Sequence, residues 1–124
     1  KSEKPERVQK KTWTGDVNQL VEFYTVAARH LKACFPELKI GGPALARASE
    51  WATDFLAEMS RRKVPIDFFS WHIYATKPQQ IVDKAVRMRT LCDKYGYTET
   101  ESILNEWNYV RGWKEDFKYT NRIL

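Results

Sequence analysis

This 124-residue sequence lacks a long apolar run and has very few cysteines and histidines. No stretch approaches the roughly 18 apolar residues of a membrane-spanning helix, so we expect no membrane partner. The two cysteines, Cys34 and Cys92, fall near the ends of predicted helices and show neither CxxC nor CxxH spacing. We therefore expect two buried free thiols rather than a disulfide. The two histidines have no acidic partners at ligand spacing, so we predict no metal site.

The sequence also lacks a targeting segment, and its central part carries no excess of positive charge. It begins at Lys1 without an initiator methionine or a signal peptide, which suggests a processed or truncated protein and gives no indication of its localisation. The formal net charge is +5, yet residues 12–110 carry twelve basic and twelve acidic side chains. The excess lies in residues 1–11 and 111–124. It therefore indicates solvated tails, and we expect no nucleic-acid partner.

What the sequence does contain is an alternation of helix and strand patterns. The predicted helices cover 16–34, 49–63 and 76–96, and the predicted strands cover 38–44, 66–74 and 102–109. Asp16 and Gln19 form a capping-box pattern at the first helix. Thr76, Pro78 and Gln79 predict the third helix start, as cap, first-turn proline and box partner.

The spacing between successive strands is about 30 residues, which is typical of β/α units with right-handed crossovers. We therefore predict an α/β protein with a parallel sheet. An open doubly wound sheet and a section of a (β/α)8 barrel both fit this pattern. A whole barrel usually needs about 250 residues, so the chain would be roughly half of one. We expect one partial domain, with a tail at 1–12, β/α units at 13–110 and a loop or helix start at 111–124.

The predicted strand at 66–74 alternates between polar and apolar side chains. The polar residues are expected to point toward a site, and they are Ser70, His72 and Tyr74. The apolar residues are expected to pack on helices, and they are Phe69, Trp71 and Ile73. His72 could instead be a core histidine bonded to a backbone carbonyl, and Tyr74 could simply pack.

The predicted strand at 102–109 ends in a cluster of polar and aromatic residues around one carboxylate, Glu106. Alternation places Ser102, Leu104 and Glu106 on one face. Because parallel strands end at the same edge of a sheet, Glu106 is expected to converge with His72 and Tyr74. Such a carboxylate, near amides and stacking rings, suits sugar chemistry, although a salt bridge to a loop would also explain it.

Five stretches, taken in order, form a set of motifs. They are Trp13-Thr14-Gly15; Tyr24 with Ala27-Ala28; Leu38-Lys39-Ile40-Gly41-Gly42-Pro43-Ala44; Ile66-Asp67-Phe68-Phe69-Ser70 with His72 and Tyr74; and Asn105-Glu106-Trp107. In order and spacing they resemble glycoside hydrolases of clan A, and most closely family 39, the β-xylosidase and α-L-iduronidase family. The resemblance covers about residues 12–110.

The resemblance implies a (β/α)8 barrel in which the three strands are the fifth, sixth and seventh. It implies a retaining mechanism with two glutamates and no cofactor. The expected substrate is a carbohydrate, in the first place a xyloside-like one. By motif position, Glu106 resembles the nucleophile. His72 and Tyr74 resemble residues that line the catalytic subsite, with the tyrosine bonded to the nucleophile. Asn105, Trp107 and Trp113 are further candidates for contacts with the sugar.

One departure from the family pattern concerns the second glutamate. The family's acid/base lies in an Asn-Glu-Pro motif upstream of the Trp13-Thr14-Gly15 stretch, and no Asn-Glu precedes Trp13 here. We therefore expect the chain alone to have little or no activity on aryl β-xylosides, and a second copy could cover its exposed strand edges. A non-catalytic carbohydrate-binding or interaction module, and an independent α/β domain with a small-molecule site, are the alternative interpretations.

Overall fold

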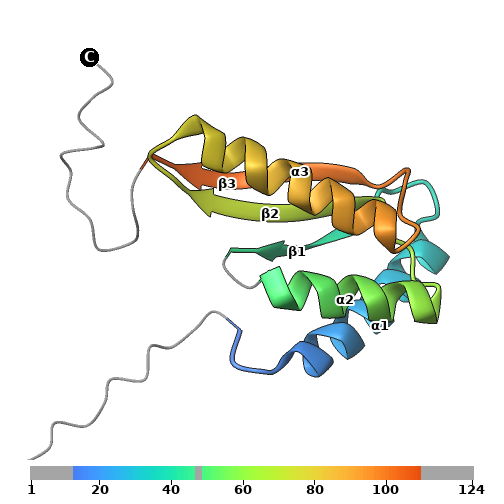
Figure 1. Ribbon diagram of the computed structural model, residues 1–124. Coiled ribbons are helices and arrows are strands. Elements are labelled where there is room, and N and C mark those ends of the chain that lie inside the picture. The colour runs from blue at the N-terminus through green and yellow to red at the C-terminus, as the bar shows by residue number, and fades with distance from the viewer. Residues whose placement is uncertain (1–12, 47–48, 110–124) are drawn as a thin grey trace, which may run out of the picture.

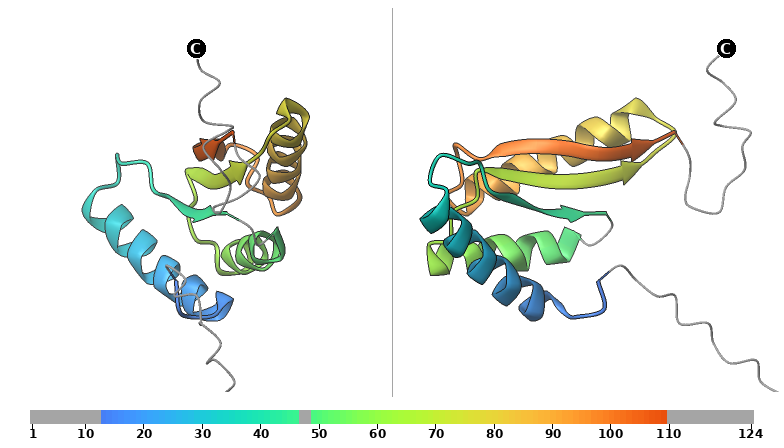
Figure 2. Two further views of the ribbon diagram at one scale, coloured as in Figure 1. Left: turned by 90° about the vertical axis from the view of Figure 1, so that its left-hand side faces the viewer. Right: turned by 180° about the vertical axis from the view of Figure 1, so that it is seen from behind.

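The computed structural model describes residues 13–46 and 49–109. Three helices alternate with three strands: α1 (Val17–Cys34), β1 (Gly41–Leu45), α2 (Ser49–Arg62), β2 (Phe68–Tyr74), α3 (Pro78–Lys94) and β3 (Glu101–Asn108). The strands form one parallel sheet in the order β1-β2-β3. The helices lie on one side of this sheet, and within the described residues nothing covers its other face (Figures 1 and 2). This confirms the predicted α/β class.

Two helix starts differ in how well the sequence predicted them. At α1, the Asp16 side chain accepts from the Gln19 backbone N–H at 2.8 Å, and the Gln19 side chain accepts from the Asp16 N–H at 3.0 Å. The predicted capping box is therefore confirmed. At α3 the predicted cap is wrong, because the helix begins at Pro78 and its cap is Lys77 rather than Thr76. The box partner is Gln80, whose side chain accepts from the Lys77 N–H at 3.2 Å.

Strand β1 begins three residues later than predicted. The Ile40 N–H, just before the strand, donates to the Asp67 carboxylate at 2.7 Å rather than to a neighbouring strand. The same carboxylate forms an ion pair with Lys32 at 2.7 Å. Because the side chain of Asp67 takes the place of a ladder partner, regular pairing starts only at Gly41, which lies beside Phe68.

The hydrophobic core fills the space between the helices and the sheet. Phe55 on α2 is fully buried, and its ring centroid lies 5.0 Å from that of Tyr24 and 6.3 Å from that of Phe69. On β2, Phe69 and Trp71 are buried and face the helices, as the alternation predicted. This face of the sheet is therefore occupied by packing, which leaves the opposite face for polar side chains.

The two cysteines do not share one environment. Cys92 on α3 is buried and free, as predicted. Cys34 is free but exposed, so the prediction of a buried thiol there is wrong. It lies at the last position of α1, with its sulfur 3.7 Å from the Nε2 atom of His30. The side of α1 that faces the core carries other residues, including Val21 and Ala28, and Cys34 is not among them.

Apolar side chains are exposed on the two helices at the ends of the helix layer. Phe23 and Val26 on α1 are 63% and 68% exposed, and Val82 and Val86 on α3 are 51% and 60% exposed. α2 lies between these helices and contacts both (Figure 2). Large apolar groups that face water at both ends are typical of a layer that continues beyond this unit. No described helix is long and apolar enough to cross a membrane.

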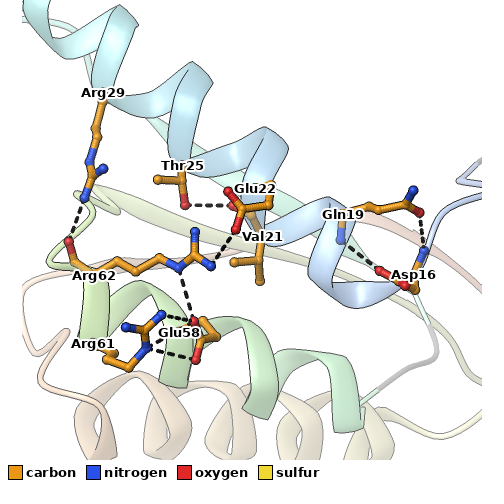
Figure 3. Close-up of polar contacts among 9 residues, drawn as sticks. All are labelled: Asp16, Gln19, Val21, Glu22, Thr25, Arg29, Glu58, Arg61 and Arg62. Carbon is orange, nitrogen blue, oxygen red and sulfur yellow. Dashed lines mark hydrogen bonds and ion pairs between the residues drawn. The ribbon is translucent and has the colours of Figure 1, made fainter.

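A cluster of five charged residues, which we name the α1–α2 ion-pair cluster, connects two helices (Figure 3). Its members are Glu22, Arg29, Glu58, Arg61 and Arg62. The Arg62 guanidinium bonds to Glu22 at 2.6 Å and to Glu58 at 3.1 Å, and Glu58 also accepts from Arg61 at 2.7 Å. Arg29 donates to the Arg62 carbonyl at 2.9 Å. The cluster therefore fixes the end of α2 against α1.

This cluster predicts a loss of stability in acid. Hydrogen bonds from Arg61 and Arg62 lower the pKa of Glu58 to about 2, and Arg62 also lowers the pKa of Glu22. An unfolded glutamate titrates at about pH 4.3, so this stabilisation is fully present above that pH and is lost as the pH falls toward 2. Because the cluster is solvent-exposed, we expect a modest effect.

The measurement is the urea midpoint of unfolding between about pH 5 and pH 2. Glu58→Gln should make this midpoint less dependent on pH than it is in the unmodified chain. Glu50→Gln, on the same helix but outside the cluster, serves as the control and should leave the dependence unchanged. An unaltered pH dependence in the Glu58 variant would contradict the assignment.

Candidate functional site

β1 is held close to β2 at its first residue, Gly41, and again near its carboxyl end. A Cβ atom on Gly41 would lie 2.0 Å from the Phe68 carbonyl oxygen, so no larger residue fits without moving the strand. Further along, the Ala44 N–H donates to the Ser70 hydroxyl at 3.0 Å. This close approach was not predicted from the sequence. Together, the two contacts fix β1 beside β2 on the approach to the carboxyl ends of both strands.

β2 presents His72 and Tyr74 on the face opposite the core. Neighbouring residues in a parallel ladder lie on the same side of the sheet, so pairing shows which side chains share a face. His72 pairs with Glu106, and Tyr74 pairs with Asn108. Four polar side chains on two adjacent strands therefore share the uncovered face near the carboxyl ends of the strands.

A bulge in β3 produces this arrangement. Trp71 pairs with Leu104, but the next residue, His72, pairs with Glu106, so Asn105 is an extra residue in β3. The prediction that Glu106 shares a face with Leu104 and Ser102 is therefore wrong. Leu104 packs against the core, and the Trp71 indole donates to the Ser102 hydroxyl at 3.0 Å on the helix side. The bulge turns Glu106 to the other face.

His72 and Glu106 come into direct contact. The His72 Nδ1 atom lies 3.5 Å from the Glu106 Oε2 atom, in ion-pair range if the imidazole is protonated. The His72 side chain is 15% exposed and the Glu106 side chain 44% exposed. The imidazole is thus packed in place, while the carboxylate remains open to the solvent. A carboxylate that is both oriented and accessible can act on a molecule bound at this face.

The other predicted site residues lie in different surroundings. Asn105 is the extra residue of the bulge, and it is exposed. Trp107 pairs with Ile73, on the helix side of the sheet rather than beside Glu106, and is 61% exposed. Trp113 lies outside the described residues. The structure therefore brings Glu106 together with His72, places Tyr74 one step along the same face, and sets Trp107 apart.

Asn108 was not among the site residues predicted from the sequence. Asn108 pairs with Tyr74 on the face of Glu106, two positions further along β3. The alternation of side chains after the bulge could have identified it, because residues two apart share a face. Within residues 13–46 and 49–109, no group of three His, Cys, Asp or Glu residues is arranged to hold a metal ion.

Known proteins share part of this sequence. A β-xylosidase of Geobacillus stearothermophilus is 47% identical over 57 residues, which make up 45% of this chain and 11% of that protein. A β-xylosidase of Caldicellulosiruptor saccharolyticus is 36% identical over 64 residues, which make up 52% of this chain and 13% of that protein. The matched regions are thus a small part of the length of these relatives.

The fold is shared as well. The crystal structure of a glucosidase from Croceicoccus marinus superimposes with a TM-score of 0.73 and 33% sequence identity, covering 87% of this chain and 25% of that one. Three parallel β/α units that match part of a glycosidase are consistent with a section of a (β/α)8 barrel. The family model for glycosyl hydrolases family 39 matches residues 4–111. The chain therefore belongs to glycosyl hydrolases family 39.

Proposed function

We propose that this chain carries the nucleophile, Glu106, of a retaining glycoside hydrolase that acts on xyloside-like substrates. The observation that supports this most is the contact between His72 and Glu106 at the carboxyl ends of adjacent parallel strands. In (β/α)8 enzymes, catalytic residues come from these strand ends. The names of the two matched β-xylosidases support the choice of sugar.

In the proposed reaction, a Glu106 carboxylate oxygen attacks the anomeric carbon and the bond to the leaving group breaks. The product is a covalent glycosyl-enzyme, which water then hydrolyses. A second carboxyl group protonates the leaving oxygen in the first step and activates the water in the second. Retention requires this group to lie about 5–5.5 Å from the nucleophile. We infer that it comes from a part of the barrel outside the described residues.

This proposal requires further β/α units. The exposed apolar residues at both ends of the helix layer, Phe23 and Val26 on α1 and Val82 and Val86 on α3, support a layer that continues on either side. For the tests, we define the completed barrel as this chain joined to the β/α units it lacks, taken from the β-xylosidase of Geobacillus stearothermophilus. The proposed activity belongs to this completed barrel and not to the 124 residues alone.

Trapping the intermediate tests the proposal. A 2-deoxy-2-fluoro-β-xyloside with a dinitrophenolate leaving group needs no protonation to react, and its fluorine slows hydrolysis of the glycosyl-enzyme. Peptide mass spectrometry should find the fluoroxylosyl adduct on Glu106 of the completed barrel. The 124-residue chain alone should show no turnover of an aryl β-xyloside. An adduct on another carboxylate, or turnover by the chain alone, would refute the proposal.

A further inference from the structure

A lysine on α3 connects the helix to the ends of two strands. The Lys84 ammonium group donates to the His72 carbonyl at 2.6 Å and to the Ala46 carbonyl at 2.7 Å. His72 is in β2, and Ala46 directly follows β1. We name this set of two hydrogen bonds the Lys84 bridge. It joins three elements at the edge of the sheet where the candidate site lies.

The two carbonyls lie just past the last pair of the β1–β2 ladder. That ladder ends where Leu45 lies beside Trp71. Beyond this pair, strand pairing no longer holds β1 and β2 together, and the Lys84 bridge connects their continuations instead. Each backbone carbonyl needs a donor when it is removed from water, and a charged donor forms a stronger bond than a neutral one.

The surroundings of the lysine are unusual for an ammonium group. Within residues 13–46 and 49–109, no carboxylate forms an ion pair with Lys84. The ammonium nitrogen lies 5.9 Å from the centre of the Trp71 ring, within the range of a cation–π contact. Burial, followed by the charge of Arg87, lowers the pKa of Lys84. Removing a lysine from water in this way has a cost, and the two charged hydrogen bonds offset it.

We propose that Lys84 is a positioning residue, which fixes the backbone of His72 and thereby holds its imidazole opposite Glu106. The carbonyl of His72 is bound by the lysine, and the Nδ1 atom of the same residue faces Glu106 at 3.5 Å. A displacement of this backbone by about 1 Å would change the contact, and misplacements of that size can reduce catalysis about 100-fold. The catalytic part of this inference rests on the proposed function, but the structural part does not.

The bridge itself can be tested in the unmodified chain. The carbonyl carbons of Ala46 and His72 are labelled with ¹³C, and their chemical shifts are followed by NMR from neutral pH up to about pH 11.5, beyond the ordinary lysine value of about 10.4. Both signals should move with one common midpoint below that value, because both carbonyls bind the same titrating group. Independent or absent titrations would overturn the proposal, and this measurement requires no variant to fold.

The effect on His72 is tested with Lys84→Met, which keeps the length of the side chain and removes the ammonium. In the chain, NMR cross-relaxation between the His72 ring and the Glu106 methylene protons should weaken. Lys94→Met is the matched control, since Lys94 is on the same helix and its nitrogen also lies over a ring, 5.2 Å from the centre of Tyr95. Unchanged cross-relaxation in a folded Lys84 variant would overturn the positioning role.

The completed barrel adds a catalytic measurement. Lys84→Met should lower kcat about 10-fold with little change in KM, Lys84→Arg should recover part of this loss, and Lys94→Met should have no effect. If the chain loses the contact between His72 and Glu106 while kcat is unaffected, the Lys84 bridge stands and the proposed function fails. If kcat falls without any loss of that contact, the positioning role fails instead.

Discussion

Glu106→Gln in the completed barrel is expected to lower kcat by at least about 10³-fold, because the proposed covalent nucleophile is lost. The carboxamide has nearly the same shape as the carboxylate, so substrate should still bind and KM should change little. Without the negative charge, however, the side chain cannot form the glycosyl-enzyme. The comparison is made by steady-state kinetics on an aryl β-xyloside, at a pH where the unmodified enzyme is active.

The matched control for this variant is Glu101→Gln. Glu101 lies on the same strand and pairs with Phe68 at the opposite end, where its carboxylate forms an ion pair with Lys39. This variant should leave kcat unchanged, because its carboxylate lies at the other end of β3. If Glu106→Gln kept full activity, the nucleophile would be another residue. If the completed barrel bound xylosides without cleaving them, a carbohydrate-binding module would be the better interpretation.

Phe55→Ala is expected to destabilise the chain by about 3–5 kcal/mol, the usual cost of removing a buried aromatic ring. Phe55 is fully buried and lies between Tyr24 on α1 and Phe69 on β2. Its loss leaves a cavity at the point where two helices meet the sheet, and close-packed neighbours can fill it only in part. The free energy of unfolding, measured by urea titration, gives the size of the effect.

Phe23→Ala is the matched control for this stability measurement. The Phe23 side chain is 63% exposed on the outer side of α1, where its ring lies 6.0 Å from Trp13. Removing it should change the free energy of unfolding by less than about 1 kcal/mol. Similar losses for the two phenylalanines would mean that the core is not centred on Phe55. A variant at Phe55 that no longer folds would agree with the prediction, since small domains are only marginally stable.

Local signals predicted most of the fold. The capping box of Asp16 and Gln19, the proline at the start of α3 and the alternation along β2 depend on residues close together in the chain. The exact strand limits depend on distant contacts. Asp67 takes the N–H of Ile40, 27 residues away, and delays the start of β1. The periodicity of apolar residues in the sequence does not predict such a contact.

The candidate site was predicted only in part, because its geometry, like the start of β1, depends on a contact between residues far apart in the sequence. Glu106 was predicted to lie near His72, but that prediction assumed unbroken alternation along β3. If the ladder continued without a bulge after Leu104, Asn105 would pair with His72 and Glu106 would pair with Ile73. Glu106 would then face the helices, because Ile73 lies on the helix side of the sheet. A bulge depends on how two strands fit together, so the sequence of one strand does not reveal it.

The extra residue in β3 also determines which changes in chain length the site could survive during evolution. If Asn105 were lost, the strand would become regular, and the glutamate would still follow Leu104 into the position beside His72. If Ser102 or Ile103 were lost instead, Leu104 and the glutamate could keep their places, but the residues before the deletion would move one place along the ladder and turn to the opposite face. The bulge is therefore a position where a lineage could shorten this strand without turning any other side chain to the opposite face.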